Sequence, residues 1–204
     1  MKINKKKFIY LISPNKIPFT FYNNLRLVLK TRKVSFFQLR LKNYSLKKKI
    51  IIGKKIKNIC KKNKVKFIIN DDPLLALKLN ADGCHLGQKD MNINIAKKIL
   101  GKKIIGITCH NSINLAKKAI KDKADYIAFG AFNQSKTKKT KYVASVKILN
   151  NVKKFTKTPT VAIGGINAIN YKNLLLNNAN FLAISGYIWK NKKYKPLQAV
   201  KRLK

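Results

Sequence analysis

Short apolar runs rich in β-forming residues alternate with longer segments of helical periodicity along the whole chain, and eight such pairs fit into its 204 residues. The expected strands lie at residues 8–13, 34–42, 66–71, 83–87, 103–110, 126–132, 160–166 and 181–188. Most of these runs are continuously apolar, which is typical of strands buried on both faces of a parallel sheet. The clearest helical segments are residues 45–63 and 112–123, the second opened by an Asn or Ser cap.

Eight βα units in about 200 residues predict a single-domain (β/α)₈ barrel spanning residues 1–204. A doubly wound open sheet is the alternative, but it normally contains fewer strands. With 46% hydrophobic positions the chain can bury one sizeable core. We therefore expect one catalytic domain of the α/β class.

The charge balance would ordinarily indicate nucleic acid or an anionic membrane as the partner, since 47 Lys and Arg residues face 6 Asp and no Glu, for a formal net charge of +41. However, arginine occurs at only four positions, and lysine is spread along the whole chain. Specific nucleic-acid readers rely on clustered arginine and on aromatic stacking platforms. We expect no specific nucleic-acid binding, and a lysine-rich nucleic-acid-binding protein is kept as an alternative.

Cysteine usage and the N-terminal sequence bear on the compartment. The three cysteines, Cys60, Cys84 and Cys109, show no CxxC spacing, so no disulfide framework is indicated. The apolar run at residues 8–12 is too short for a signal peptide, and no apolar segment is long enough to cross a bilayer. We expect a cytoplasmic protein without membrane contacts.

The few carboxylates point to a metal site. They are Asp71, Asp72, Asp82, Asp90, Asp122 and Asp125, so four of the six fall between positions 71 and 90. Asp71 ends the expected third strand and Asp90 lies in the loop after the fourth, so both should reach the same rim of the barrel. Two neighbouring carboxylates suit Mg²⁺. The alternatives are a helix cap for Asp71 and Asp72 and a turn for Asp90; the other three aspartates are expected in turns.

Further polar residues gather where other strands are expected to end. Gln38, Arg40 and Lys42 follow a period of two and should share one face, where they could bind an anion such as diphosphate; for Lys42 a solvated strand end is the alternative. Gly164 and Gly165 follow the seventh strand, and residues 184–186 close the eighth, in the loops that commonly bind phosphate in such barrels. Residues 133–139 predict a mobile lid over polyanionic ligands, with a solvated loop as the alternative.

Two adjacent Cys-His pairs, at residues 84–85 and 109–110, invite a zinc hypothesis. Neighbouring strand residues point to opposite faces, so each pair could give at most one ligand to a common site. We therefore expect small core cysteines, with His110 forming a hydrogen bond at the rim.

The chain resembles the thiamine phosphate synthase family from about residue 8 to residue 188. The motifs that carry the resemblance are residues 38–42 (QLRLK), 69–71 (IND), 83–90 (GCHLGQKD), 106–111 (GITCHN), 137–138 (TK) and 161–166 (VAIGGI). The resemblance implies a (β/α)₈ fold, Mg²⁺, and the joining of hydroxymethylpyrimidine diphosphate to hydroxyethyl-methylthiazole phosphate with release of diphosphate. It also implies a dissociative reaction in which the chain supplies no nucleophile.

By position, the resemblance assigns Mg²⁺ to Asp71 and Asp90. It assigns the pyrimidine diphosphate to Gln38, Arg40, Lys42, Asn70 and Lys138, of which Arg40, Lys42 and Lys138 would stabilise the departing diphosphate. Thr108 stands where the family usually has serine. The thiazole phosphate would be bound by Ser135, Thr137, Gly164, Gly165, Ile184 and Ser185.

The chain departs from the family pattern in two places. In the sixth loop Ala131 stands where proline is common, and Asn133, Gln134 and Ser135 replace a Phe-Pro-Thr-like stretch; Asp72 stands where arginine is frequent. A thiazole tautomerase-like paralogue and an inactive synthase are the related alternatives, and the tautomerase tends to lack the diphosphate and metal residues. The oligomeric state is left open between a monomer and a homo-oligomer.

Overall fold

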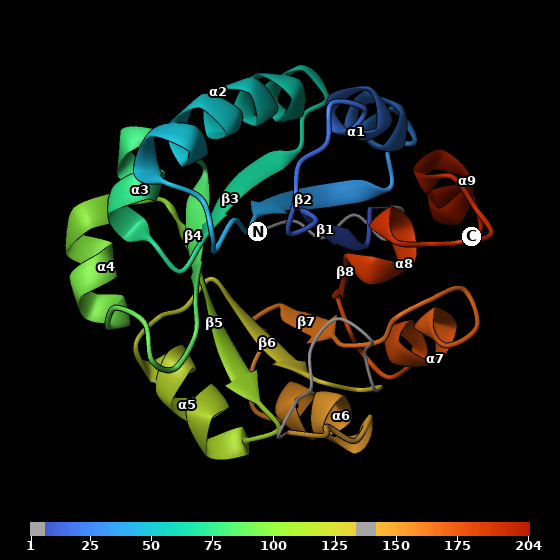
Figure 1. The fold of residues 1–204 in the computed structure, drawn as a ribbon. Coiled ribbons are helices and arrows are strands. Elements are labelled where there is room, and N and C mark those ends of the chain that lie inside the picture. The colour runs from blue at the N-terminus through green and yellow to red at the C-terminus, as the bar shows by residue number, and fades with distance from the viewer. Residues whose placement is uncertain (1–6, 134–141) are drawn as a thin grey trace.

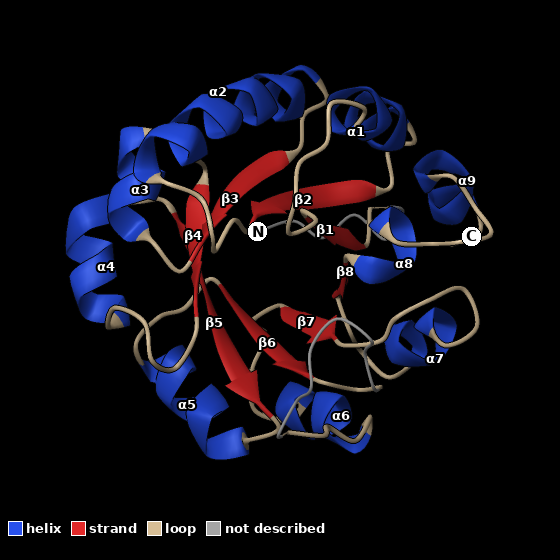
Figure 2. Ribbon diagram, viewed as in Figure 1, coloured by secondary structure: helices blue, strands red, loops and turns tan. Residues whose placement is uncertain are grey.

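The computed structural model describes residues 7–133 and 142–204 and shows a closed barrel of eight parallel strands. The strands follow one another around the barrel in chain order, and helices surround them on the outside (Figures 1 and 2). The barrel closes where β1 pairs with β8, with Tyr10 opposite Ala183. The (β/α)₈ prediction is confirmed, and the open doubly wound sheet is wrong.

The strands are short, as is common in parallel barrels. They are β1 (Ile9–Ile12), β2 (Val34–Leu39), β3 (Lys66–Asn70), β4 (Gly83–Leu86), β5 (Ile104–His110), β6 (Tyr126–Gly130), β7 (Thr160–Ile163) and β8 (Phe181–Ile184).

The helices of the described residues are α1 (Phe21–Lys30), α2 (Leu46–Lys62), α3 (Pro73–Lys78), α4 (Ile93–Leu100), α5 (Ile113–Lys121), α6 (Lys147–Lys153), α7 (Tyr171–Leu176), α8 (Gly186–Trp189) and α9 (Pro196–Lys201). Four of them, α2, α3, α4 and α5, begin at a residue whose side chain caps them. Ser45 caps α2 and Ser112 caps α5, each accepting a hydrogen bond from a backbone N–H three residues on. Both predicted helices are confirmed. Among the described residues, no helix is long and apolar enough to cross a membrane.

The buried side chains form two clusters on the two faces of the barrel wall. The larger cluster packs the outward side chains of the strands against the helices. The smaller cluster fills the barrel itself and contains the rings of Tyr10, Phe36, Tyr126 and Phe181. Aromatic rings stack or meet edge-on there, with the Tyr10 and Phe36 centroids 5.3 Å apart. These rings fill the barrel from the N-terminal ends of the strands to its middle, so a ligand can reach only the end where the strands have their C-termini.

Three strands end three or four residues earlier than the sequence predicts. The strand expected at 34–42 ends at Leu39, because the N–H of Arg40 donates to the Oγ of Ser13 and not to a neighbouring strand (2.9 Å). The strand expected at 160–166 ends at Ile163, because Gly164 and Gly165 adopt positive φ angles of 108° and 57°. The strand expected at 181–188 ends at Ile184, and α8 begins at Gly186.

Aspartates at the opposite, N-terminal end of the barrel have structural contacts. Asp82 accepts a hydrogen bond from the N–H of Phe67 (2.9 Å), and Asp125 accepts one from the N–H of Ile105 (2.8 Å). Each carboxylate thereby ties the start of one strand to the segment that enters the next. Asp122 is the C-terminal cap of α5, so these three residues lie in turns as predicted.

The start of β4 requires a glycine. A Cβ on Gly83 would lie 2.1 Å from the backbone oxygen of Ile104 in the neighbouring strand. We predict that Gly83→Ala lowers the free energy of unfolding by roughly 3 kcal/mol, because a backbone atom of a paired strand cannot move aside. Urea unfolding followed by circular dichroism measures this loss.

Gly53→Ala in α2 is the matched control. Its Cβ would meet the flexible end of the Leu79 side chain, and alanine is favoured over glycine inside a helix by about 1 kcal/mol. We expect a change of less than about 1 kcal/mol for this control. Equal losses in the two variants would contradict the role assigned to Gly83.

Candidate active site

Two carboxylates meet at the C-terminal rim of the barrel. Asp71 follows β3 directly in a left-handed conformation (φ 66°), and its N–H donates to the carbonyl oxygen of His85 (2.8 Å). Asp90 lies in the loop after β4, and its Oδ2 accepts a hydrogen bond from the N–H of Gly87 (2.6 Å). A side chain at position 87 would crowd that oxygen, since a Cβ there would lie 3.0 Å from it. A backbone N–H thus holds the Asp90 carboxylate, and a backbone hydrogen bond fixes the main chain at Asp71.

The surroundings of Asp71 shift the titration of its carboxyl group. The pKa of Asp71 is raised above its ordinary value by burial, by a hydrogen bond with the Asp90 side chain and by repulsion from the Asp90 charge. Lys42 and Arg40 act in the opposite direction. The Nζ of Lys42 lies 3.8 Å from Oδ2 of Asp71, and its side chain is 58% exposed, so this ion pair is weak.

A cavity of about 540 Å³ opens beside the carboxylate pair. It lies between the loops that follow β2, β3 and β4, and its polar lining includes Lys42, Asn70, Asp71, Lys89 and Asp90. Hard oxygen donors in contact, with cationic side chains around them, suit Mg²⁺ carrying an anionic ligand. Within residues 7–133 and 142–204 no three His, Cys, Asp or Glu side chains form a metal cluster. A cation here would therefore depend on two carboxylates, water and ligand oxygens.

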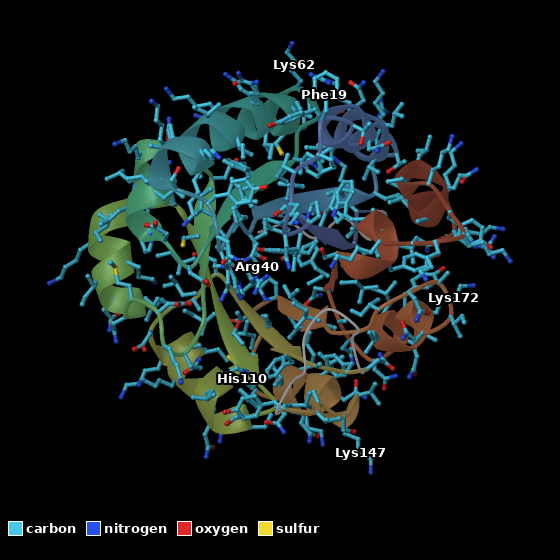
Figure 3. The ribbon with its side chains drawn as sticks, in the orientation of Figure 1. Phe19, Arg40, Lys62, His110, Lys147 and Lys172 are labelled. Carbon is cyan, nitrogen blue, oxygen red and sulfur yellow. The ribbon has the colours of Figure 1, made fainter. Side chains whose placement is uncertain are left out.

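The end of β2 contributes polar groups, but not in the predicted arrangement. Gln38 is buried, 3% exposed, and its amide donates to Oδ1 of Asn70 on the next strand (2.6 Å). Arg40 follows the strand, lies toward the centre of the ring of strands (Figure 3) and donates to Oδ1 of Asn15 (3.3 Å). Lys42 lies in a turn and reaches Asp71 instead. Arg40 and Lys42 both lie beyond the end of β2, so the predicted period-two arrangement within one strand is wrong for both, although all three residues come to the same rim.

Inside the barrel, His85 joins the rim to the aromatic core. Its Nε2 lies 2.8 Å from the hydroxyl of Thr108, and its Nδ1 lies 2.9 Å from the hydroxyl of Tyr126. Burial lowers the pKa of His85 to about 4, against a smaller opposing effect of the Asp90 charge. From the sequence, His85 was expected at most as a zinc ligand, and no role was expected for Tyr126. The inward, period-two position of His85 within β4 was the signal that could have found this contact.

The loop after β7 lies beside the loop after β6, and the loop after β8 lies beside the loop after β1. A Cβ on Gly164 would lie 2.4 Å from the Cβ of Ala131, so this glycine permits close packing of the two loops. Ser185 donates its hydroxyl to the carbonyl oxygen of Ser13 (3.2 Å). Ile184 is 2% exposed, and its side chain belongs to the outer core, so only its backbone is left to contact a ligand.

Several predicted residues fall outside the described part of the chain. Gln134, Ser135, Thr137 and Lys138 lie within the stretch 134–141 that the structure does not describe. The segments on either side of it are joined, because the N–H of Ala131 donates to the oxygen of Tyr142 (3.0 Å) and that of Ala144 to the oxygen of Ala131 (2.9 Å). Asp72 is the N-cap of α3 and accepts from the N–H of Leu75 (2.9 Å), as the cap alternative predicted.

Comparison with known proteins decides the family. A model of the family described as thiamine monophosphate synthase matches residues 9–188, nearly the whole chain. The chain belongs to this family. A relative named thiamine-phosphate synthase, from Pelagibacter ubique (strain HTCC1062), is 70% identical over 207 residues and is covered completely by the match, as is this chain. A second one, from Erythrobacter litoralis (strain HTCC2594), is 37% identical and covers 94% of this chain and 92% of its own.

Solved structures agree with the family assignment. Thiamine phosphate pyrophosphorylase from Pyrococcus furiosus superposes with a TM-score of 0.86 at 28% identity, covering 98% of this chain and 94% of that one. The stretches on which the resemblance to this family was based lie on the rim described above, at the ends of β2, β3, β4, β5 and β7, except residues 137–138, which fall outside the described part of the chain.

The depressed pKa of His85 predicts a dependence of stability on pH. Between pH 6.5 and about 4 His85 is protonated in the unfolded chain but neutral in the folded chain. The free energy of unfolding is therefore highest above this range and falls as the pH decreases through it. We expect a loss of up to about 3 kcal/mol by pH 4. Urea unfolding between pH 7 and 4 measures it, and the loss stands out because the chain has only six carboxylates.

His85→Gln is the control for this titration. The raised pKa of Asp71 acts with the opposite sign in both proteins, so the difference between their pH profiles isolates the histidine. We expect the variant to lose clearly less stability on acidification. Parallel profiles for the two proteins would contradict the assignment.

Proposed function

We propose that this protein is a transferase that makes thiamine phosphate from hydroxymethylpyrimidine diphosphate and hydroxyethyl-methylthiazole phosphate, with release of diphosphate. The observation that carries the proposal is the full-length match, at 70% identity, to a relative named thiamine-phosphate synthase. The site supports it independently, because the contact between Asp71 and Asp90, with Lys42 beside it, provides both charges that a metal-bound diphosphate requires.

Asp71 and Asp90 are proposed to hold Mg²⁺ together. Burial and mutual repulsion raise the pKa of Asp71, and a divalent cation bound between the carboxylates would relieve that repulsion. When bound, Mg²⁺ neutralises charge on the diphosphate and makes it a better leaving group. The Gly87 N–H holds the Asp90 carboxylate, and the bond from the Asp71 N–H to the oxygen of His85 fixes the main chain from which the Asp71 carboxylate extends.

Arg40, Lys42 and Lys138 are proposed to stabilise the departing diphosphate. The bond between the pyrimidine methylene carbon and the diphosphate oxygen breaks, the electron pair leaves with diphosphate, and the thiazole nitrogen then forms the new bond to that carbon. Charge stabilisation and positioning supply the catalysis, so no side chain of the enzyme needs to act as a nucleophile. Gln38, Asn70 and Thr108 are proposed to orient the pyrimidine diphosphate.

The thiazole phosphate is proposed to bind on the opposite side of the rim. Gly164, Gly165, Ile184 and Ser185 would offer backbone N–H groups there, and Ser135 and Thr137 would add hydroxyls from the sixth loop. The positive φ angles of both glycines support this assignment, since they turn the chain sharply beside the rim.

The alternatives have less support. A thiazole tautomerase would not need the carboxylate pair, and a nucleic-acid-binding protein would not need a polar rim. We propose a cytoplasmic location, because Cys60, Cys84 and Cys109 are all buried free thiols, as a reducing compartment permits.

The direct test is formation of thiamine phosphate from the two substrates at moderate salt, with Mg²⁺ and with a chelator. We expect equal amounts of thiamine phosphate and diphosphate with Mg²⁺, and a rate at least about 100-fold lower without it, because metal-assisted charge stabilisation is worth several kcal/mol. Moderate salt suppresses nonspecific binding of the anionic substrates to the lysine-rich surface. Failure to form product while thiazole phosphate still binds would favour the tautomerase or an inactive relative.

A further inference from the structure

Four side chains in the barrel form one unbranched chain of hydrogen bonds that runs from the aromatic core to the rim. The hydroxyls of Tyr10 and Tyr126 lie 2.7 Å apart, and the Tyr126 hydroxyl lies 2.9 Å from Nδ1 of His85. Nε2 of His85 lies 2.8 Å from the hydroxyl of Thr108. The four residues come from β1, β6, β4 and β5, so the series of hydrogen bonds crosses the barrel interior.

The two ends of this series of hydrogen bonds differ in their surroundings. Tyr10 is 1% exposed, and its hydroxyl has no other hydrogen-bond partner in the described part of the chain. It is enclosed by the Phe36 and Tyr126 rings. Thr108 at the other end is only partly buried and lies at the rim. Only the Thr108 end can meet a ligand.

This asymmetry fixes the direction of every donor. If Thr108 donated to His85, then Nδ1–H would donate to Tyr126, Tyr126 would donate to Tyr10, and the Tyr10 proton would be buried without an acceptor. In the opposite direction Tyr10 donates to Tyr126, Tyr126 donates to Nδ1, and Nε2–H donates to the oxygen of Thr108. Every proton inside the barrel then has an acceptor, and the hydroxyl proton of Thr108 points away from His85.

We propose that His85 is a positioning residue, which through its Nε2–H makes the hydroxyl of Thr108 a hydrogen-bond donor to the substrate. The inference rests on the proposed function, in which Thr108 faces the pyrimidine diphosphate. The site then selects, at this position, a ligand group that accepts a hydrogen bond, either a ring nitrogen or a diphosphate oxygen. Among ligands otherwise alike, one that presents an N–H here would leave two donors facing each other and would be rejected.

The tautomer of His85 can be measured without any substrate. The chain contains only two histidines, so labelling histidine with ¹⁵N gives four ring signals, and His110→Gln assigns them. At pH 7 we expect a protonated Nε2 and an unprotonated Nδ1 for His85. A protonated Nδ1, or exchange between both tautomers, would overturn the proposal. Because no turnover is needed, this result is independent of whether the protein makes thiamine phosphate.

Two substitutions at position 85 test the effect on catalysis. His85→Gln keeps an N–H donor that can reach Thr108, whereas His85→Leu removes it, and both lose the bond to Tyr126. We expect kcat/KM of the Leu variant to be about tenfold below that of the Gln variant, as for the loss of one hydrogen bond to a reacting substrate. Equal values for two folded variants would overturn the proposal.

Tyr171→Phe is the matched control for disturbing a buried hydroxyl. The hydroxyl of Tyr171 donates to the carbonyl oxygen of Lys204 (2.6 Å), outside the barrel interior. We expect this variant to keep both the tautomer of His85 and the wild-type kcat/KM. A changed tautomer in this control would show that the readout reports general destabilisation, and it would remove the support for the proposal.

Discussion

Closure of the sheet between β1 and β8 is the constraint on which the rest of the molecule depends. It brings the loops after the first and last strands together, where the hydroxyl of Ser185 donates to the oxygen of Ser13 and the indole N–H of Trp189 donates to the oxygen of Ile12 (2.7 Å). All eight strands are parallel, so the loops that follow them all lie at the C-terminal rim of the barrel. Polar groups scattered over the whole sequence become neighbours as a result.

The rim brings negative charges together in a chain that is otherwise strongly basic. Six carboxylates face 47 basic residues, yet two of the six are in contact with each other. Burial first, and then the neighbouring Asp90 side chain, raise the pKa of Asp71, so a proton or a cation between the two carboxylates would be favourable. The repulsion that a cation between the two carboxylates would relieve is the physical basis for the metal proposal, and Lys42 beside them would balance an anionic ligand.

Much of this architecture could be predicted from local sequence, because apolar runs and capping residues report on their own immediate structure. The barrel, the caps at Ser45 and Ser112 and the approach of Asp71 to Asp90 follow from such patterns together with the rule that parallel strands end at one rim. The end of β2 could not be predicted, since it depends on a hydrogen bond from the Arg40 N–H to Ser13, 27 residues earlier in the chain.

The hydrogen-bond chain through His85 was equally hidden from sequence reasoning. Tyr126 lies 41 residues from His85, and their contact requires the sheet to curve so that inward side chains of β4 and β6, which flank β5, meet inside the barrel. The left-handed conformation of Asp71 is also set by its surroundings, namely the bond from its N–H to the oxygen of His85. Residue patterns predict which groups reach the rim, whereas the partners of each group depend on tertiary contacts.

The central claim is that the Asp71–Asp90 pair binds Mg²⁺ together with diphosphate, and calorimetric titration of inorganic diphosphate tests it most directly. At moderate salt, Mg²⁺ should tighten diphosphate binding to the wild-type protein by about tenfold or more, the size expected when one charge-assisted contact is gained. Asp90→Asn should lose most of this enhancement, whereas Asp122→Asn, at the distant end of α5, should retain it. An equal enhancement in both variants would contradict the assignment of the metal to this pair.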